Sequence, residues 1–336
     1  PAPADPPLAT PFAPVGSPRP PAASPSAPAG PSAAADSPPA LFSLDDLGPP
    51  ADPLPASATE DALAAVPSIL AAGPGGTEFG TFAHTVFEAT DFAADDLDAE
   101  LARTVGAALA RRPVDIGDRA TIIAGLRAAI ETPLGPLVGG LRLRDVRRED
   151  RLDELTFELP LVGGDEPTGE LTPAAIGAVL RAHLAPGDPL AGYADRLEDP
   201  ELRASVRGYL TGSIDLVVRV GDAFAIADYK TNWLAAPGEA LTAWHHRPAA
   251  LAAEMEHAHY GLQALLYTAA LHRYLRWRLR GYDPERHLAG VLYLFVRGMT
   301  GPDTPTVDGT PCGVFAWRPP APLVLALSDV LDRGAA

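Results

Sequence analysis

The sequence has 336 residues, of which 47% are apolar and 21% are charged, so it is long enough for one large or two small packed domains. Its single cysteine, Cys312, excludes a disulfide framework and a cysteine-based zinc site, and no run of about 18 uncharged apolar residues could span a membrane. The formal net charge of −17 is unlike that of a free-standing nucleic-acid-binding domain, so a nucleic-acid function has to be argued from a specific site.

The N-terminal part has the composition of a linker. Of the 38 prolines, 18 fall within residues 1–55, where alanine and serine make up most of the rest. We therefore expect residues 1–75 to be a largely disordered linker and residues 76–336 to form the folded domain. Pro1 is not a natural start and no signal-peptide pattern follows it, so we expect a cytoplasmic fragment.

Helical and strand patterns alternate along the rest of the chain. They predict helices over 80–92, 97–111 and 118–132, two strands within 141–161, strands over 206–220 and 223–230, a helix over 249–280, a buried strand over 287–297 and a closing helix over 321–333. Such an order is typical of an α/β fold with a mixed sheet.

A hairpin signal, Gly221-Asp222, lies between the two best strand candidates. A turn centred there makes residues whose numbers sum to 443 face each other, which places Asp215 opposite Asp228. Two carboxylates at that spacing repel by roughly 3 kcal/mol at an effective dielectric constant near 20. A divalent cation between them would offset this repulsion.

Lys230 is the only lysine among 26 basic residues. Because strand side chains alternate, Lys230 lies on the face of Asp228 while Tyr229 points away. Two oxygen ligands and an amine suit Mg²⁺ or Mn²⁺ and a metal-polarised water. An exposed hairpin edge with scattered charges is the alternative. The position of the only lysine, directly after Asp228-Tyr229, also excludes a P-loop.

These residues carry a resemblance to a known family. The segments Gly212–Val217 and Asp228–Leu234 (GSIDLV and DYKTNWL) resemble the motif of the PD-(D/E)XK nuclease superfamily, and more narrowly the C-terminal nuclease domain of exodeoxyribonuclease V beta subunits. Segments 80–88, 260–275 and 290–299 agree with that family in order, so the similarity covers about residues 76–333. It implies a restriction-endonuclease-like α/β fold: a mixed sheet flanked by helices, with further helices at the N-terminal side.

The resemblance also implies a metal-dependent deoxyribonuclease. Its metal, Mg²⁺ with Mn²⁺ as the alternative, would be bound by His84, Asp215, Asp228 and the main-chain carbonyl of Tyr229. Asp215, Asp228 and Lys230 would be the catalytic residues. An acid near the metal corresponds to Glu154 or to Glu158, and the sequence leaves both open.

The family further implies an exonuclease or endonuclease that hydrolyses DNA phosphodiester bonds in double-strand-break repair by recombination. A helicase motor, absent from this sequence, would deliver the DNA, chiefly as single strands. RecC- and RecD-like subunits and a RecA-like recombinase are the implied partners, and no membrane is involved. A non-catalytic docking module with a nuclease-like fold, and an RNA-directed or structure-specific nuclease, are the alternatives.

Other residues have two interpretations each. His84 by itself is more typical of a half-buried helix residue than of a ligand. Gln263 and Tyr267, four apart on a helix, either belong to an aromatic core stripe or position a DNA strand or a water. Trp233 could stack on a base, although packing against the end of the sheet is the favoured interpretation. The basic run 272–280 either holds phosphates or is a solvated helix end.

Overall fold

The computed structural model describes residues 59–162, 170–199 and 208–334. The predicted linker over residues 1–58 and the first residues of the strand predicted over 206–220 lie outside this part of the chain. Among the described residues, no helix is both long enough and apolar enough to cross a membrane.

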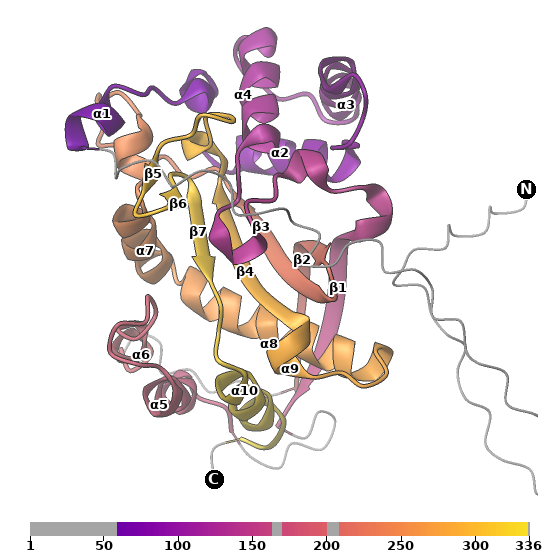
Figure 1. The fold of residues 1–336 in the computed structure, drawn as a ribbon, viewed down its shortest axis with the longest axis vertical. Coiled ribbons are helices and arrows are strands. Elements are labelled where there is room, and N and C mark those ends of the chain that lie inside the picture. Colours follow the sequence, from indigo (N-terminus) through magenta and orange to yellow (C-terminus); the bar gives the residue numbers. More distant parts are fainter. Residues whose placement is uncertain (1–58, 163–169, 200–207, 335–336) are drawn as a thin grey trace, which may run out of the picture.

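The centre of the fold is a mixed five-stranded sheet in the order β1-β2-β3-β4-β7 (Figure 1). The pair β3–β4 is parallel and the other neighbouring pairs are antiparallel, which confirms the predicted mixed sheet. The strands span Arg151–Leu161 (β1), Gly208–Val220 (β2), Ala223–Lys230 (β3), Leu288–Phe295 (β4) and Val314–Trp317 (β7). A separate small ribbon joins β5 (Thr306–Val307) to β6 (Thr310–Pro311).

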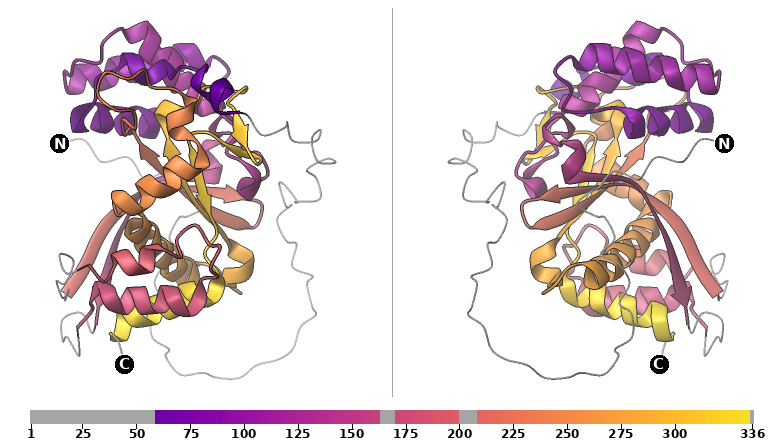
Figure 2. Two further views of the ribbon diagram at one scale, coloured as in Figure 1. Left: turned by 90° about the vertical axis from the view of Figure 1, so that its left-hand side faces the viewer. Right: turned by 90° about the vertical axis from the view of Figure 1, so that its right-hand side faces the viewer.

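Helices cover both faces of the sheet (Figure 2). One face packs against α2 (Thr77–Ala89), α3 (Leu97–Arg111) and α4 (Arg119–Glu131). The other packs against α5 (Pro173–His183), α6 (Tyr193–Arg196), α7 (Pro248–His257), α8 (Tyr260–Arg278) and α10 (Ala321–Arg333). Two short helices, α1 (Glu60–Ala64) and α9 (Pro284–His287), complete the set. Because side chains of a strand alternate between faces, each core takes every second residue of β3.

The restriction-endonuclease-like α/β class is confirmed, and so are several element boundaries. Helix α3 has the predicted bounds, and the ends of α4 lie within one residue of the prediction because Asp118 caps its start by accepting a hydrogen bond from the main chain of Thr121. Strand β3 and helix α10 also begin and end where the pattern placed them.

Three sequence predictions are wrong in detail. The folded part begins before residue 76, because α1 and the 3₁₀ turn Ile69–Ala72 already bury Leu63 and Leu70. The first strand predicted within 141–161 is replaced by two 3₁₀ turns, the first of which forms because the carboxylate of Asp145 caps the main chain of Arg142. The single helix predicted over 249–280 is divided into α7 and α8.

The division falls at His259, whose φ of +56° is left-handed and ends the helical path. The hydroxyl of Tyr193 lies 3.0 Å from Nδ1 of His259 and fixes this turn from the neighbouring helix α6. The break reorients the chain, so that α8 starts at Tyr260 beside the end of β3.

Candidate active site

Strands β2 and β3 separate at the two predicted acids. Their paired residues run from Val220↔Ala223 to Leu216↔Ala227, with numbers that sum to 443 as predicted. Asp215 and Asp228 come next, but the main-chain ladder stops there and the main-chain N–H of Tyr229 donates to Oδ2 of Asp215 instead, at 3.0 Å. The two acids therefore flank an opening at the end of the hairpin rather than forming a ladder pair.

Asp228 and Lys230 form a buried ion pair on the α8 side of the sheet. Oδ2 of Asp228 lies 2.5 Å from Nζ of Lys230, and the Asp228 residue is 1% exposed. Apart from this pair, Oδ2 of Asp228 has no hydrogen-bond partner in the described part of the chain. Burial and, to a smaller extent, the charge of Asp215 raise the pKa of Asp228 to about 6, against the opposing effect of Lys230.

Helix α8 and strand β4 enclose the ammonium group of Lys230. Nζ donates to Oε1 of Gln263 at 3.0 Å and lies 4.2 Å from the ring centroid of Tyr260 and 5.2 Å from that of Tyr293. Two aromatic faces and an amide oxygen stabilise a cation strongly. Tyr260 and Tyr293 were missed as site residues, and an aromatic stripe gives no signal that separates a wall of the site from ordinary core.

Gln263 forms hydrogen bonds through both atoms of its amide group. Its Oε1 also accepts from the hydroxyl of Tyr293 at 3.1 Å, and its Nε2 donates to the hydroxyl of Tyr267 at 2.9 Å. Burial, together with the charges of Asp228 and Asp215, raises the pKa of Tyr267, so the phenol stays protonated. Gln263 thus orients Lys230 through a network of hydrogen bonds that also includes Tyr267 and Tyr293.

His84 enters the site from α2 on the other side of the opening. Its Nδ1 lies 3.2 Å from Oδ2 of Asp215, and its Nε2 lies 2.8 Å from the carbonyl oxygen of Tyr229. Burial lowers the pKa of His84, but the hydrogen bond to Asp215 and the charges of Asp215 and Asp228 outweigh it, so the pKa is raised. Both ring nitrogens face oxygen acceptors, and an imidazolium, which donates from both, satisfies this geometry.

The four predicted metal ligands are thus gathered around one opening. Within the described ranges, however, no three His, Cys, Asp or Glu side chains are arranged as a metal-holding group, and the carboxylate of Asp228 is paired with Lys230. Two carboxylates and a carbonyl are the hard oxygen donors that Mg²⁺ prefers. The donor chemistry therefore fits the ion, and its binding requires Asp228 to turn and His84 to lose a proton.

Of the two candidate glutamates, Glu154 is the one beside the site. In the β1–β2 register it falls between the pairs Asp153↔Leu216 and Leu155↔Ile214, level with Asp215. Its φ of +51° marks a local irregularity in β1. Glu158 pairs with Thr211, which is four residues or about 13 Å further along the strand.

Glu88 is an acid that we did not single out from the sequence. It lies one helical turn after His84 on α2, and burial together with the charges of Glu154 and Asp153 raises its pKa. The spacing of four between His84 and Glu88 was the available signal, because it places both on one helix face.

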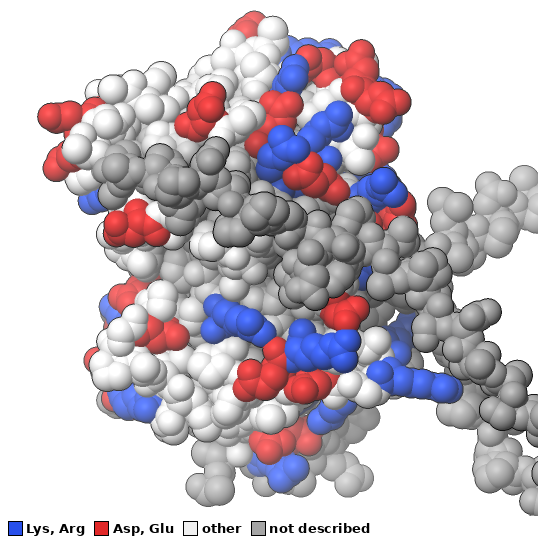
Figure 3. All heavy atoms as spheres, viewed as in Figure 1, with Lys and Arg blue, Asp and Glu red and all other residues white. Residues whose placement is uncertain are grey.

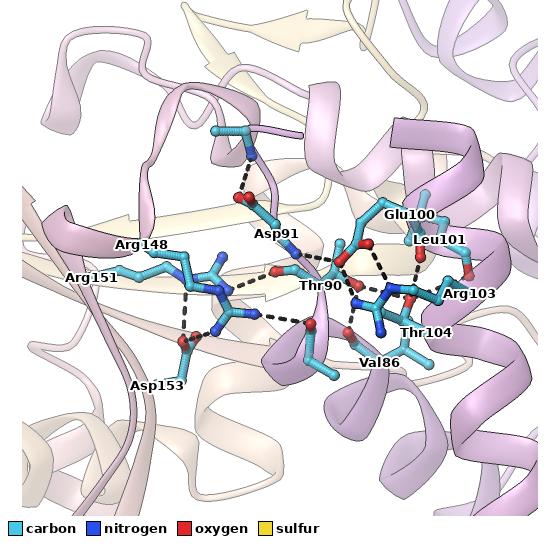
Figure 4. A network of polar contacts seen from close by, with 12 residues as sticks. Val86, Thr90, Asp91, Glu100, Leu101, Arg103, Thr104, Arg148, Arg151 and Asp153 are labelled. Carbon is cyan, nitrogen blue, oxygen red and sulfur yellow. Dashed lines mark hydrogen bonds and ion pairs between the residues drawn. The ribbon is translucent and has the colours of Figure 1, made fainter. Parts of the chain in front are cut away.

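A polar network attaches the end of α2 to the start of β1 (Figure 4). The buried guanidinium of Arg151 donates to the carbonyl of Thr90 at 2.6 Å and to Asp153 at 3.2 Å. Arg148 donates to the carbonyl of Ala89 at 2.9 Å and lies 3.5 Å from the same aspartate. These contacts fix the helix that carries His84 relative to the strand that carries Glu154.

A groove of about 560 Å³ runs past the site. It passes between the N-terminal half of α2 and the segment after β3. The two walls approach closely at Gly80, where an added Cβ atom would lie 3.2 Å from Oγ1 of Thr231. His84 and Lys230 line its inner part. Its other lining residues are Gly76, Thr77, Gly80, Thr81, Tyr229, Thr231, Asn232, Trp233 and Tyr260.

Two arginines with positively charged neighbours are occupied by contacts within the fold. Arg273 donates to the hydroxyl and the carbonyl of Ser328 and thereby ties α8 to α10, so it does not belong to a phosphate site. Arg142 is paired with Asp145, and basic and acidic side chains alternate over the face shown in Figure 3.

The mixed sheet and the parted hairpin are those of a restriction-endonuclease-like fold, and the comparisons agree. A sequence profile of the PD-(D/E)XK nuclease superfamily matches residues 63–311, and the chain belongs to this superfamily.

Among curated proteins, the chain is similar to the RecBCD enzyme subunit RecB of three bacteria. It is 51% identical over 272 residues to that of Mycolicibacterium smegmatis, with 80% of this chain and 25% of that protein covered. For Mycobacterium tuberculosis strain H37Rv the identity is 49% over 275 residues (80% and 25%), and for Escherichia coli K12 it is 33% over 266 residues (78% and 19%). The predicted resemblance is confirmed, and the chain spans about a quarter or less of the length of these relatives.

Magnesium binding is expected to compete with protons at this site. The raised pKa values of Asp228, about 6 against 3.8 for the ordinary group, and of His84 mean that the folded, metal-free state holds extra protons. The contribution of Asp228 and His84 to the stability of the metal-free protein is therefore present at low pH, and it is lost as the pH rises through their pKa values in the folded state. We therefore expect the increase in melting temperature caused by Mg²⁺ to be larger at pH 8 than at pH 6, as thermal unfolding with and without the ion would show. An increase that does not change with pH would contradict the proton-competition model.

Proposed function

We propose that this chain is a Mg²⁺-dependent deoxyribonuclease domain that hydrolyses phosphodiester bonds, with Mn²⁺ as a substitute ion. The observation that carries the proposal is the opening between β2 and β3, where His84 contacts both Asp215 and the Tyr229 carbonyl, and the ion pair of Asp228 with Lys230 lies at its border. This combination of oxygen donors and one amine suits phosphate chemistry.

Each residue has a distinct task in the proposed reaction. Asp215, Asp228, His84 and the Tyr229 carbonyl hold the ion, which when bound supplies a Lewis acid for the phosphate and an acidified water. Lys230 donates a hydrogen bond to the phosphate oxygen on which negative charge develops. Gln263 aims that ammonium group and Tyr267 fixes Gln263, while Glu154 adds negative charge beside Asp215.

The cellular role follows from the relatives. The matched relatives carry the name RecBCD enzyme subunit RecB, so we propose that this domain acts in the cytoplasm in recombinational repair of double-strand breaks, beside RecC- and RecD-like subunits and a RecA-like recombinase. The chain has a net charge of −17, and acidic and basic side chains are intermixed on the face shown in Figure 3, so it has little electrostatic attraction for DNA. Delivery of single strands by a linked motor raises the local DNA concentration and removes the need for such attraction.

A degradation assay tests the proposal. The complete protein is incubated with matched linear DNA and RNA strands, with Mg²⁺, with Mn²⁺, or with a chelator. We expect cleavage of DNA with either ion and none with the chelator. Binding of partner subunits without any cleavage would instead support the docking module, and preferential cleavage of RNA would support an RNA-directed nuclease on this fold.

A further inference from the structure

Trp233 is exposed where a packing residue would be buried. It lies three residues after Lys230, lines the same groove, and is 41% exposed. The indole is therefore only partly covered, and the remainder of its surface faces solvent. An exposed aromatic side chain within about 10 Å of chain from a catalytic lysine needs another explanation.

The segment that carries Trp233 is fixed from one side by a buried arginine. Arg297 is 1% exposed, and its guanidinium lies 5.4 Å from the indole centroid of Trp233 and 4.7 Å from the ring of Phe79. Its Nε donates to the carbonyl of Thr231 at 2.9 Å. One face of the indole therefore rests on a cation that cannot move away.

The other side of the segment is fixed by Asn232. Its Nδ2 donates to Glu254 at 2.7 Å and to the hydroxyl of Tyr260 at 3.1 Å, and the Tyr260 ring in turn lies over Lys230. Trp233 is thus held between two anchored neighbours and still presents part of its ring to the groove. A rigid aromatic surface loses little conformational entropy when a ligand stacks on it.

The groove around Trp233 suits a single nucleic-acid strand. The α2 side consists of glycines and threonines, which leave room for a chain and offer hydroxyl donors to phosphate oxygens. A base inside a duplex is stacked on both faces, whereas a base in a single strand has a free face for an aromatic side chain.

We propose that Trp233, supported by Arg297, is the stacking platform for an unpaired base next to the scissile phosphate, and that it gives the site its preference for single-stranded DNA. This inference rests on the proposed nuclease function and adds the form of the substrate to it. Stacking positions the strand and does not participate in the bond-breaking step.

The test compares Trp233→Ala and Trp233→Phe with the parent in the complete protein, using single-stranded oligonucleotides that carry one abasic site at successive positions. We expect Trp233→Ala to raise KM for single strands about tenfold with a smaller change in kcat, and Trp233→Phe to retain most of the affinity. In the parent, an abasic site at one fixed distance from the cleaved bond should weaken cleavage, because the base that stacks on Trp233 is then missing. In Trp233→Ala, cleavage should no longer depend on the position of the abasic site. Trp277→Ala is the matched control, because Trp277 is 72% exposed on α8 and does not line the groove.

Two results would overturn the inference. One is an unchanged abasic profile in Trp233→Ala, and the other is an equal loss on single strands and on duplex ends, which would indicate a general structural role. Asp228→Ala, assayed beside these variants, distinguishes failure of the nuclease proposal from failure of the stacking proposal. If Asp228→Ala cleaves DNA normally, the nuclease proposal itself fails. If Asp228→Ala is inactive while Trp233→Ala behaves like the parent, only the stacking proposal is rejected.

Discussion

Asp228→Asn is expected to lower DNA cleavage about a thousandfold or more while the protein stays folded. The amide keeps the size of the carboxylate and can still accept a hydrogen bond from Lys230, so the pair loses the negative charge of Asp228 but not its shape. The position between Asp215, His84 and the Tyr229 carbonyl would then lack one of its two negative charges, which weakens binding of a divalent ion. Cleavage of linear DNA and calorimetric titration with Mn²⁺ measure the two effects separately.

The matched control is Asp222→Asn at the tip of the same hairpin. Asp222 is exposed and paired with Arg286, so its loss should leave both cleavage and ion binding unchanged. Lys230→Gln provides a second variant, which we expect to retain Mn²⁺ binding and lose cleavage, because the amine acts on the phosphate rather than on the ion. Normal cleavage by Asp228→Asn with intact Mn²⁺ binding would contradict the assignment of Asp228.

Local rules explain why the hairpin could be predicted from the sequence. A Gly-Asp turn signal between two alternating apolar runs fixes the register, and the register alone brings Asp215 and Asp228 to the same level. The retention of one lysine among 25 arginines marked Lys230 independently of any turn. His84, by contrast, could be assigned only through the resemblance. Its contact with the Tyr229 carbonyl joins residues 145 positions apart, and no local rule predicts such a contact.

The parts that could not be predicted depend on contacts between distant segments. Side-chain capping converted the first strand predicted within 141–161 into turns, since Asp145 bonds the main chain of Arg142. The break at His259 depends on Tyr193, which lies 66 residues earlier. The aromatic enclosure of Lys230 combines Tyr260 and Tyr293 from a helix and a strand, and helical periodicity shows only that each could be buried.

Arg297→Met is expected to destabilise the fold by about 3 kcal/mol. Besides the carbonyl of Thr231, the guanidinium donates to the carbonyls of Leu70, Gly73 and Pro74, so it joins the N-terminal segment to the end of β3. Burial lowers the pKa of Arg297 to about 10, which still leaves it charged at pH 7.

Two opposing effects decide the sign of this change. Replacing a buried charge by an apolar side chain removes a desolvation penalty and is sometimes neutral. Here it also removes the guanidinium donor from four main-chain carbonyls. The carbonyl of Leu70 still accepts from the main-chain N–H of Gly73, whereas a buried carbonyl left unpaired costs about 1–3 kcal/mol before relaxation and water offset part of that cost. We therefore expect destabilisation to dominate, with Arg297→Lys intermediate because an ammonium cannot reproduce the planar fork of five donors.

Thermal and urea unfolding of the 336-residue chain would measure the loss, and Arg286→Met is the control because its side chain is exposed. Faster hydrogen exchange limited to residues 69–74 and 231–233 would locate the effect at the segment that supports Trp233. Since that segment borders the groove, Arg297→Met should also raise KM for single strands at temperatures where the fold is intact. If its stability and hydrogen exchange matched those of Arg286→Met, the connection between the N-terminal segment and the catalytic strand would have to be attributed to apolar packing around Leu70 and Phe79 instead.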